Sequence, residues 1–474
     1  MKELRFRVRI ISILLLFLLV VLALYASYSV KIYGTRWFGN GRNVRVLADK
    51  DKVLPGKIYD VNGKLLRYTD GNGERKSTGS ILEQSALVHV LGDSQNQVSN
   101  GVEKFQARYL YGYDAGFGDL LYSFVRGQKR VGDNITLTID SALQTKIVEQ
   151  FQNHANLRGK NGAAVVMNYK TGEVLALVSV PVFDPHHIPE SAFTDERNPF
   201  FNRATQSVLP PGSTFKMLTM AAALQDNPKL WEEDFICNGA FLADQLTIKD
   251  YGGAVHDTIS LQRAFEVSCN NVFAQISVNL GTQKMKNYAE QFGFNDNFLF
   301  GDIVVENSSF PLAENTFQLA TSGIGQSKLL STPMHMCMVA AGIANDGVMM
   351  EPLLLKKVQS NNGTVRFTME PTVYRSAVPP DVARKLQTAM LGVVSRGTGT
   401  RAAISGYKVA GKTGSAESVE NGKPVTHAWF TGFITNPNKP YAVCVFVENG
   451  GTGGRVAAPL AHTIFQELSR SHYE

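Results

Sequence analysis

Three short groups of residues in this chain have the types and the spacing needed for nucleophilic catalysis. In chain order they are Ser213 with Lys216, Ser268 with Asn270, and Lys412 with Thr413 and Gly414. The patterns S-x-x-K, S-x-N and K-T-G, in this order, are typical of enzymes in which an activated serine attacks an amide and holds the acyl group. One such pattern alone would be weak in 474 residues, but the ordered set of three strongly indicates this chemistry.

Ser213 is expected at the start of a helix over residues 214–225, because Pro210 and Pro211 cannot continue a preceding helix. Free backbone N–H groups at a helix start can bind an oxyanion. Lys216 lies one turn along the same face, so its amine can reach the Ser213 hydroxyl. It accepts a proton only when neutral, and burial would have to lower its pKa from the usual ~10.4. The alternative is a capping serine followed by a solvated lysine.

Ser268 and Asn270 interrupt a long helical pattern over residues 261–280, in which Ser260 is a suitable cap. Small polar residues at such a break can direct a hydroxyl and an amide toward a substrate. Ser268 is then a candidate to pass a proton between Lys216 and a leaving amine, and Asn270 to bind a substrate amide. The alternative is a polar kink or cap with no catalytic role.

Lys412 and its neighbours follow residues 407–411, which alternate like a β-strand. On an edge strand, Lys412 and Thr413 would offer a cation and a hydroxyl to a carboxylate, and Gly414 would leave room beside the backbone. The N–H of Ser415 is a candidate second oxyanion donor, with that of Ser213 as the first.

Other chemically suggestive residues are better explained by structure. His186 and His187 precede a proline and are expected in a loop, and nothing pairs His427 with a serine. The glycine-rich stretches 397–400 and 450–455 lack the lysine of a phosphate-binding loop and are interpreted as turns.

The cysteines give no sign of a metal site. The chain has four of them, widely spaced and without C-x-x-C or another zinc-ligand spacing: Cys237, Cys269, Cys337 and Cys444. Each is interpreted as a small buried apolar residue. We therefore expect no metal and no cofactor.

The N-terminal region predicts a membrane anchor. Residues 10–30 are almost wholly apolar and, as a helix, would span about 31 Å, enough to cross a hydrocarbon core of about 30 Å. Four basic residues precede them, which favours a cytoplasmic tail over residues 1–9 and an extracytoplasmic remainder. A cleaved signal peptide is the alternative, but the apolar run is long for one. Residues 1–45 carry a net charge of +7, whereas the whole chain carries +6. The rest of the chain therefore has no excess of positive charge with which to bind nucleic acid.

The remainder divides by pattern into a linker over residues 31–52, a β-rich pedestal over 53–158 with Asn62-Gly63 as a hairpin signal, and one large domain over 159–474. Asp140 is expected to cap a helix over residues 141–156. In the large domain, strands at 163–168, 174–180, 429–435 and 441–447 enclose helical segments that include residues 333–345 and 380–395. The predicted class is α+β, with the two hairpins meeting in one antiparallel sheet.

These features together resemble the class B penicillin-binding proteins, the monofunctional D,D-transpeptidases of bacterial cell walls. The likeness covers nearly the whole chain. Besides the three motifs it includes the strings at 137–140, 172–176, 210–212, 323–326 and 397–400. The resemblance implies a membrane anchor, a pedestal, and a transpeptidase domain with a five-stranded antiparallel sheet between helical layers. A departure is Pro55-Gly56, where many members have Arg-Gly.

The resemblance also implies roles for the residues. Ser213 would be the acylated nucleophile and Lys216 its base, with Ser268 and Asn270 opposite. Lys412 and Thr413 would bind the terminal carboxylate of a stem peptide ending in D-Ala-D-Ala. β-Lactams would acylate the same serine, and a membrane glycosyltransferase would be a partner. The alternatives are a D,D-carboxypeptidase, a serine β-lactamase, and a non-catalytic β-lactam sensor or scaffold.

Overall fold

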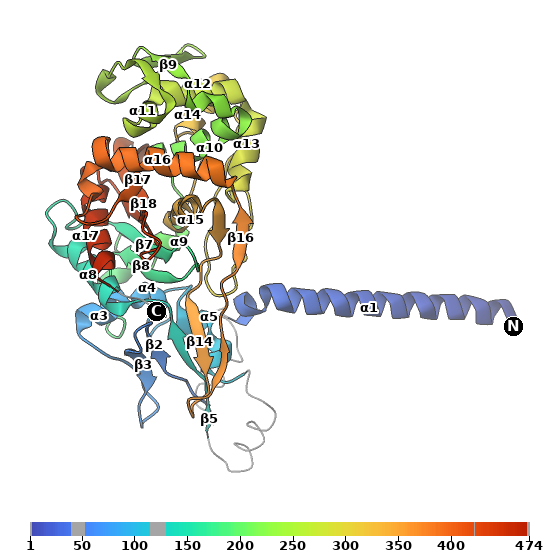
Figure 1. Ribbon diagram of the computed structural model, residues 1–474. Helices are drawn as coiled ribbons and strands as arrows, with labels where there is room; N and C mark the ends of the chain where they lie inside the picture. The colour runs from blue at the N-terminus through green and yellow to red at the C-terminus, as the bar shows by residue number, and fades with distance from the viewer. Residues whose placement is uncertain (1, 39–52, 114–128, 421, 472–474) are drawn as a thin grey trace.

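The computed structural model describes residues 2–38, 53–113, 129–420 and 422–471. Helix α1 (Lys2–Phe38) projects away from the rest of the molecule (Figure 1). Its segment Arg5–Val30 is long and apolar enough to cross a membrane. The helix continues through residues 31–38, which the sequence analysis assigned to a linker, because no proline interrupts it there. The rest of that predicted linker, residues 39–52, lies outside the described residues.

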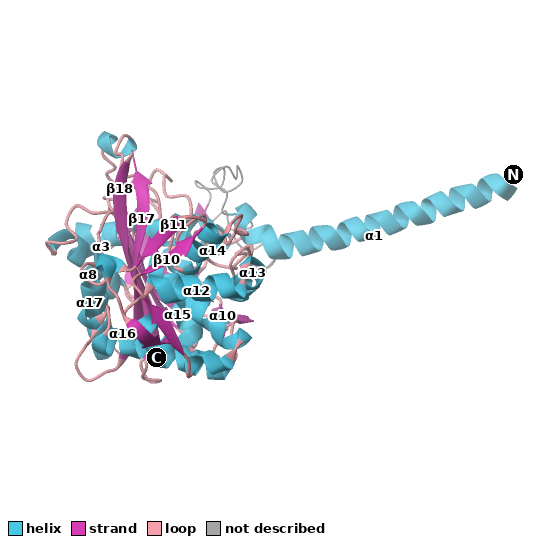
Figure 2. Ribbon diagram, turned by 90° about the horizontal axis from the view of Figure 1, so that it is seen from above, coloured by secondary structure: helices cyan, strands magenta, loops and turns pink. Residues whose placement is uncertain are grey.

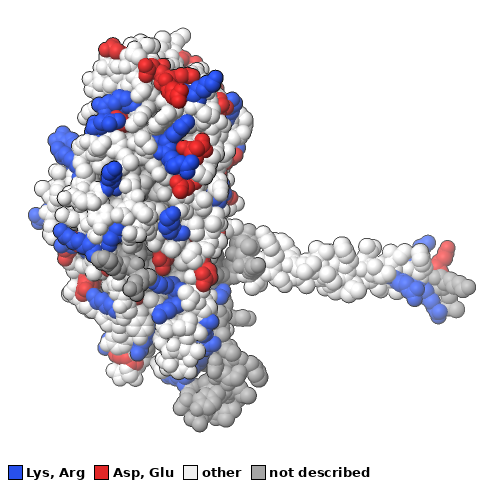
Figure 3. All heavy atoms as spheres, viewed as in Figure 1, with Lys and Arg blue, Asp and Glu red and all other residues white. Residues whose placement is uncertain are grey.

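Charged side chains are distributed unevenly between this helix and the rest of the protein. Figure 3 shows basic side chains gathered at the N-terminal end of α1, whereas both signs are mixed over this face of the remainder. This arrangement agrees with the charge pattern of the sequence, in which residues 1–45 hold the basic excess.

A six-stranded sheet forms the lower part of the molecule. Across the sheet its strands are β15 (Val365–Thr368), β14 (Leu355–Gln359), β6 (Asn134–Leu137), β2 (Ile58–Tyr59), β3 (Leu65–Thr69) and β4 (Arg75–Ser77). Around it lie α3 (Ile81–Ala86), α4 (Val88–Leu91), α5 (Val102–Phe105), α6 (Ala107–Leu110) and the parallel pair β1 (Val53–Leu54) and β5 (Arg130–Val131). The hairpin predicted at Asn62-Gly63 is confirmed: Gly63 has a positive φ of 80° in the turn between β2 and β3.

Two strands of this sheet come from the part of the chain that the sequence analysis placed in the large domain. In β14, Val358 pairs with Ile135 of β6, and both side chains are fully buried. The sheet therefore crosses the boundary predicted at residues 158 and 159. The cause is a contact between segments more than 200 positions apart, which the local pattern around β14 does not reveal.

The upper part is built on a five-stranded antiparallel sheet with the order β17-β18-β19-β7-β8. Its strands are β7 (Gly162–Asn168), β8 (Val174–Val180), β17 (Val409–Glu420), β18 (Lys423–Ile434) and β19 (Tyr441–Val447). The predicted meeting of the two hairpins is confirmed, because β19 pairs with β7 in a register that sets Val443 against Val166.

Helices cover both faces of this central sheet (Figures 1 and 2). Successive residues of β19 belong to two different apolar clusters: Cys444 and Phe446 lie on the side of α15 (Pro333–Ala344), and Val443 and Val445 on the side of α17 (Ala457–Arg470). Because both faces are buried, these strands read as continuous apolar runs rather than as an alternating pattern. Helix α8 (Ser141–Asn153) lies on the α17 side, and Asp140 caps it as predicted by accepting from the N–H groups of Ala142 and Leu143.

The remaining elements lie mainly above the sheet on the α15 side. The helices among these elements are α9 (Arg203–Gln206), α10 (Lys216–Asp226), α11 (Leu261–Glu266), α12 (Asn270–Leu280), α13 (Thr282–Gln291), α14 (Thr316–Gly323) and α16 (Pro380–Arg396). The 3₁₀ turns are η1 (Glu190–Phe193), η2 (Gly212–Phe215), η3 (Pro228–Trp231), η4 (Tyr251–Gly253) and η5 (Thr400–Ala402). Its short strands are β9 (Asp234–Cys237), β10 (Ala240–Ala243), β11 (Leu246–Lys249), β12 (Asp257–Ser260), β13 (Val348–Met350) and β16 (Val373–Ser376). The helix break predicted near Ser268 is confirmed between α11 and α12.

The shared six-stranded sheet predicts a specific stability effect. Val358→Asp places a charge against Ile135 in a fully buried position and should lower the free energy of unfolding by about 3 kcal/mol or more. The matched control is Val365→Asp in the same hairpin, where the side chain is 48% exposed and the change should be small. Chemical unfolding of the full chain in detergent measures both. Equal losses in the two variants would contradict a structural role for this hairpin.

Candidate active site

Ser213 lies in the 3₁₀ turn η2, immediately before α10. Pro211 is the capping residue of the turn and Phe215 that of the helix, so Ser213 is not the helix cap of the alternative interpretation. Gly212 has a positive φ of 55°, and a Cβ there would come within 3.0 Å of the Ser415 carbonyl. Glycine at this position therefore allows the turn that carries Ser213 to lie close to strand β17.

Lys216 is the first residue of α10 and is completely buried, which excludes a solvated lysine. Its Nζ donates to the Ser268 carbonyl oxygen at 2.7 Å and to Asn270 Oδ1 at 2.7 Å, and it lies 3.3 Å from Ser268 Oγ. Burial lowers the pKa of Lys216 to about 7, despite the opposite influence of Cys269 and Asp250. Near neutral pH this amine is therefore divided between its charged and neutral forms.

Ser268 joins α11 to α12 with a positive φ of 63°, an uncommon conformation for a serine. Its hydroxyl oxygen lies 2.9 Å from Lys412 Nζ as well as 3.3 Å from Lys216 Nζ. One hydroxyl thus bridges two buried amines from two different elements. A hydroxyl both accepts and donates, so this position is suited to transferring protons.

Lys412 is also completely buried, and its Nζ donates to Thr413 O at 3.2 Å in addition to Ser268. Burial, followed by the nearby amine of Lys216, holds the pKa of Lys412 well below its ordinary value. The two amines disfavour each other's charged state, because like charges in a buried site repel.

Strand β17 is an edge strand of the central sheet, as predicted. The Gln326 side chain lies along this edge. In the amide orientation that satisfies both of its polar atoms, its oxygen accepts from the N–H of Glu417 at 3.0 Å and its nitrogen donates to Glu417 O at 3.3 Å. The peptide groups of Glu417 therefore face away from β18, and by the two-residue repeat of a strand those of Ser415 do so too. A Cβ on Gly414 would lie 2.8 Å from Pro211 O, so only glycine allows the strand to lie this close to the turn before Ser213.

The structure also brings in residues that the sequence analysis interpreted as turns. Thr398 shares a 2.6 Å hydrogen bond with the Thr413 hydroxyl. The N–H of Gly453 donates to Ser415 Oγ at 3.2 Å, and a Cβ on Gly453 would lie 2.1 Å from Trp429 O. The glycine-rich stretch is therefore a close-packed wall beside β17. The sequence signalled this packing against β17 only through the threonines and glycines of residues 397–400 and 450–455.

The three histidines considered in the sequence analysis lie outside this arrangement. His186 Nε2 contacts Ser77 Oγ at 3.0 Å, and the exposed His187 has its Nδ1 3.3 Å from Asp184 Oδ2. His427 is buried on β18, where its Nδ1 accepts from the N–H of Asn449 at 3.3 Å. None of these contacts involves Ser213, in agreement with the sequence analysis.

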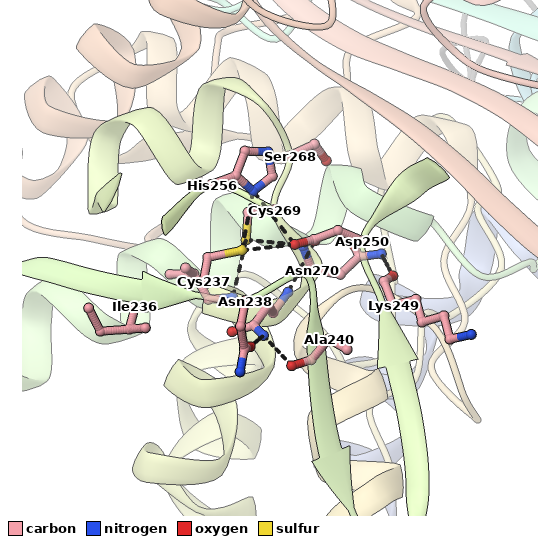
Figure 4. A network of polar contacts seen from close by, with 12 residues as sticks. Ile236, Cys237, Asn238, Ala240, Lys249, Asp250, His256, Ser268, Cys269 and Asn270 are labelled. Carbon is pink, nitrogen blue, oxygen red and sulfur yellow. Dashed lines mark hydrogen bonds and ion pairs between the residues drawn. The ribbon is translucent and has the colours of Figure 1, made fainter. Parts of the chain in front are cut away.

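Two of the four cysteines lie together in the folded chain. All four are buried, as expected, but Cys237 and Cys269 are not isolated. Their sulfur atoms lie 3.4 Å apart, and both lie beside Asp250 and His256 (Figure 4). The linear spacing did not match a known ligand pattern because the β10–β11 hairpin, η4, β12 and α11 lie between Cys237 and Cys269.

Comparison with known proteins identifies the family. Residues 162–466 match the penicillin binding protein transpeptidase domain. The chain belongs to this family. It is 32% identical to the peptidoglycan D,D-transpeptidase PbpA of Mycolicibacterium smegmatis, over 95% of this chain and 96% of that protein. It is 28% identical to stage V sporulation protein D of Bacillus subtilis, over 90% of this chain and 70% of that protein.

Solved structures agree with this assignment. Penicillin-binding protein A from M. tuberculosis, as its imipenem acyl-enzyme complex, matches with a TM-score of 0.78 and 30% identity, over 89% of this chain and all of that one. The resemblance to class B penicillin-binding proteins and the α+β fold with a five-stranded antiparallel sheet are confirmed. The chain is accordingly a serine-type transpeptidase.

Proposed function

We propose that this chain cross-links peptidoglycan stem peptides ending in D-Ala-D-Ala through an acyl group on Ser213, and that β-lactams acylate the same hydroxyl. The observation that carries the proposal is the buried contact of Lys216 and Lys412 with a single hydroxyl, that of Ser268. Lys216 itself lies one helical turn after Ser213. The names of the relatives, D,D-transpeptidase PbpA and an imipenem acyl-enzyme, support the reaction and the inhibitor class.

In this proposal neutral Lys216 takes the proton of the Ser213 hydroxyl as its oxygen attacks the carbonyl of the penultimate D-Ala. The N–H groups of Ser213 and Ser415 stabilise the oxyanion, and removing one such donor typically costs ~10²–10³ in rate. Ser268 passes the proton from Lys216 to the leaving nitrogen, so terminal D-Ala departs as a neutral amine. The amine of a second stem peptide then attacks the acyl carbonyl, loses its proton to the same relay and restores Ser213.

Lys412 and Thr413 bind the terminal carboxylate of the donor peptide in this proposal, with Gly414 giving the substrate access to the strand. Thr398 holds the Thr413 hydroxyl, and Asn270 both anchors Lys216 and binds a substrate amide. A carboxylate beside Lys412 favours the charged form of that lysine, so binding of substrate would draw a proton to it and leave Lys216 as the neutral amine.

The membrane arrangement is part of the same proposal. Helix α1 would be retained as a single-pass anchor, with its basic N-terminal end in the cytoplasm and the rest of the chain outside. The tail would be residues 1–9 and the anchor residues 10–30. The pedestal would be residues 53–158, completed by the β14–β15 hairpin, and the rest of residues 159–474 would form the transpeptidase domain. The natural partner is a membrane glycosyltransferase, because the strands that carry the stem peptides must be polymerised beside the anchor.

The assignment of the nucleophile predicts the result of one substitution. Ser213→Ala removes the attacking oxygen and should abolish covalent labelling by a fluorescent penicillin, while thermal unfolding stays unchanged. The matched control is Ser395→Ala on the exposed side of α16, which should label normally. Intact mass after labelling, followed by mapping of the adduct, measures both variants. Labelling that persists in Ser213→Ala would contradict the assignment.

The choice between cross-linking and hydrolysis predicts a second result. A D-Ala-D-Ala peptide supplied with an excess of acceptor amine should give the new amide as its main product, because the acyl group on Ser213 reacts with the amine faster than with water. Chromatography of the products with and without the acceptor measures this. If only the free acid forms in excess acceptor, the chain is a carboxypeptidase.

A further inference from the structure

The outer edge of strand β17 offers a substrate peptide only a few positions at which to pair. In a strand, the peptide groups of every second residue face the same side, so those of Thr413, Ser415 and Glu417 all face away from β18. Ser415 is the central position and lies against Gly212 in the turn before Ser213. Glu417 is the position on the side away from Lys412, toward the end of the strand.

The position at Glu417 is already filled by the side chain of Gln326. In the orientation that satisfies both polar atoms, its amide oxygen accepts from the N–H of Glu417 and its nitrogen donates to Glu417 O. The amide also comes within 3.5 Å of Ser415 O, so it borders the next pairing position. A primary amide has the donor and the acceptor of a peptide group. Gln326 therefore takes the place that a neighbouring strand would take at Glu417.

The backbone of Gln326 is fixed by the end of helix α14. Its N–H donates to Thr321 O at 3.0 Å, and Gly325 before it has a positive φ of 82°, which together make a Schellman cap. Gly325 O accepts from the N–H of Gly212 at 2.9 Å, and a Cβ on Gly325 would come within 1.8 Å of Gly212 O. The Gln326 side chain therefore extends from a point that is tied to the turn carrying Ser213.

The direction of the donor peptide along β17 follows from the proposed function, on which this inference rests. With its terminal carboxylate at Thr413 and its scissile carbonyl at the N–H of Ser415, the donor runs antiparallel to β17, and its N-terminal side points toward Glu417. In an antiparallel pair, the residues that exchange both hydrogen bonds recur at every second position. When the penultimate D-Ala pairs with Ser415, the residue two positions before it falls opposite Glu417.

We propose that Gln326 limits the donor to a single residue pair on β17, that of the penultimate D-Ala with Ser415, and is thereby a specificity-determining residue. A donor that continues as an extended, α-linked peptide finds the peptide groups of Glu417 occupied and gains no affinity from its added length. The substrate class that suits this edge is a short stem that turns away from the strand before it reaches Glu417.

One substitution uncovers the position at Glu417. Gln326→Ala removes the amide and leaves both peptide groups of Glu417 open to an extended donor, while the backbone cap of α14 is kept because it involves no side-chain atom of Gln326. Lys328→Ala is the matched control from the same segment, since Lys328 is 59% exposed and pairs with Glu314 at 2.6 Å. Hydrogen exchange around Glu417 should become faster in Gln326→Ala and stay unchanged in Lys328→Ala.

Three synthetic donors that end in D-Ala-D-Ala test the proposal. The first has one residue and an acetyl cap before this end, and the second continues through two further α-linked residues. The third is the second donor with an N-methyl group on the residue opposite Glu417, which prevents it from donating to Glu417 O. Titration calorimetry measures their binding to the full chain in detergent, with Ser213→Ala to prevent turnover.

The protein that retains Gln326 should bind all three donors with equal affinity, as should the Lys328→Ala variant. With Gln326→Ala, the extended donor should bind about fivefold more tightly than the other two, because it forms an added hydrogen bond to Glu417. In proteins that keep Ser213, the same preference should appear in KM for D-Ala release, whereas kcat should not change.

The outcomes distinguish this inference from the proposed function. Tighter binding of the extended donor by the protein that retains Gln326, or equal binding of all three donors after Gln326→Ala, would overturn the limit set by Gln326. If no donor releases D-Ala but the extended donor still gains affinity only after Gln326→Ala, the proposed function fails and the limit stands. Donors that bind to none of these proteins would overturn both.

Discussion

The candidate active site depends on two buried lysine amines that contact the same hydroxyl group, that of Ser268. Lys216 and Lys412 are both fully buried, and both donate to Ser268 Oγ. Two ammonium groups cannot share such a position at low cost, because each loses hydration and repels the other. In the proposed mechanism, a carboxylate that binds beside Lys412, or a proton that leaves Ser213, would therefore be met by proton exchange between the two amines. The chemistry follows from the same burial that makes the arrangement costly to fold.

The rest of the fold brings three distant segments to that point. The central sheet fixes β17 as an edge strand, α10 places Lys216 one turn after Ser213, and the break between α11 and α12 turns Ser268 toward both amines. Close approach is possible because glycines stand at the contacts: Gly212 faces Ser415, and Gly414 faces Pro211 O. Asp250 supports the helix break from behind, because its carboxylate accepts from the N–H groups of Asn270 and Asn271 at the start of α12.

Much of the fold and of the site could be predicted from the sequence, because these features depend on residues that are close together in the chain. The three motifs, the cap at Asp140, the helix break at Ser268 and the two central hairpins each lie within a few residues and follow turn and periodicity rules. The parts that could not be predicted depend on contacts between distant segments. The strand β14 pairs with β6, and the glycine-rich stretch after Gly450 packs on β17. Cys237 reaches Cys269 only because β9 and β12 pair around the inserted β10–β11 hairpin.

The central claim, that buried Lys216 is the base for Ser213, is tested most directly by the pH dependence of penicillin acylation. The neutral fraction of Lys216 grows as pH rises through its pKa of about 7, with Lys412, Asp250 and Cys269 as the ionisable groups around it. The second-order rate constant should therefore rise with pH and level off above about pH 8. A rate that keeps rising tenfold per unit toward pH 10, as for a lysine in water, or one that does not change between pH 5 and 9, would contradict this account.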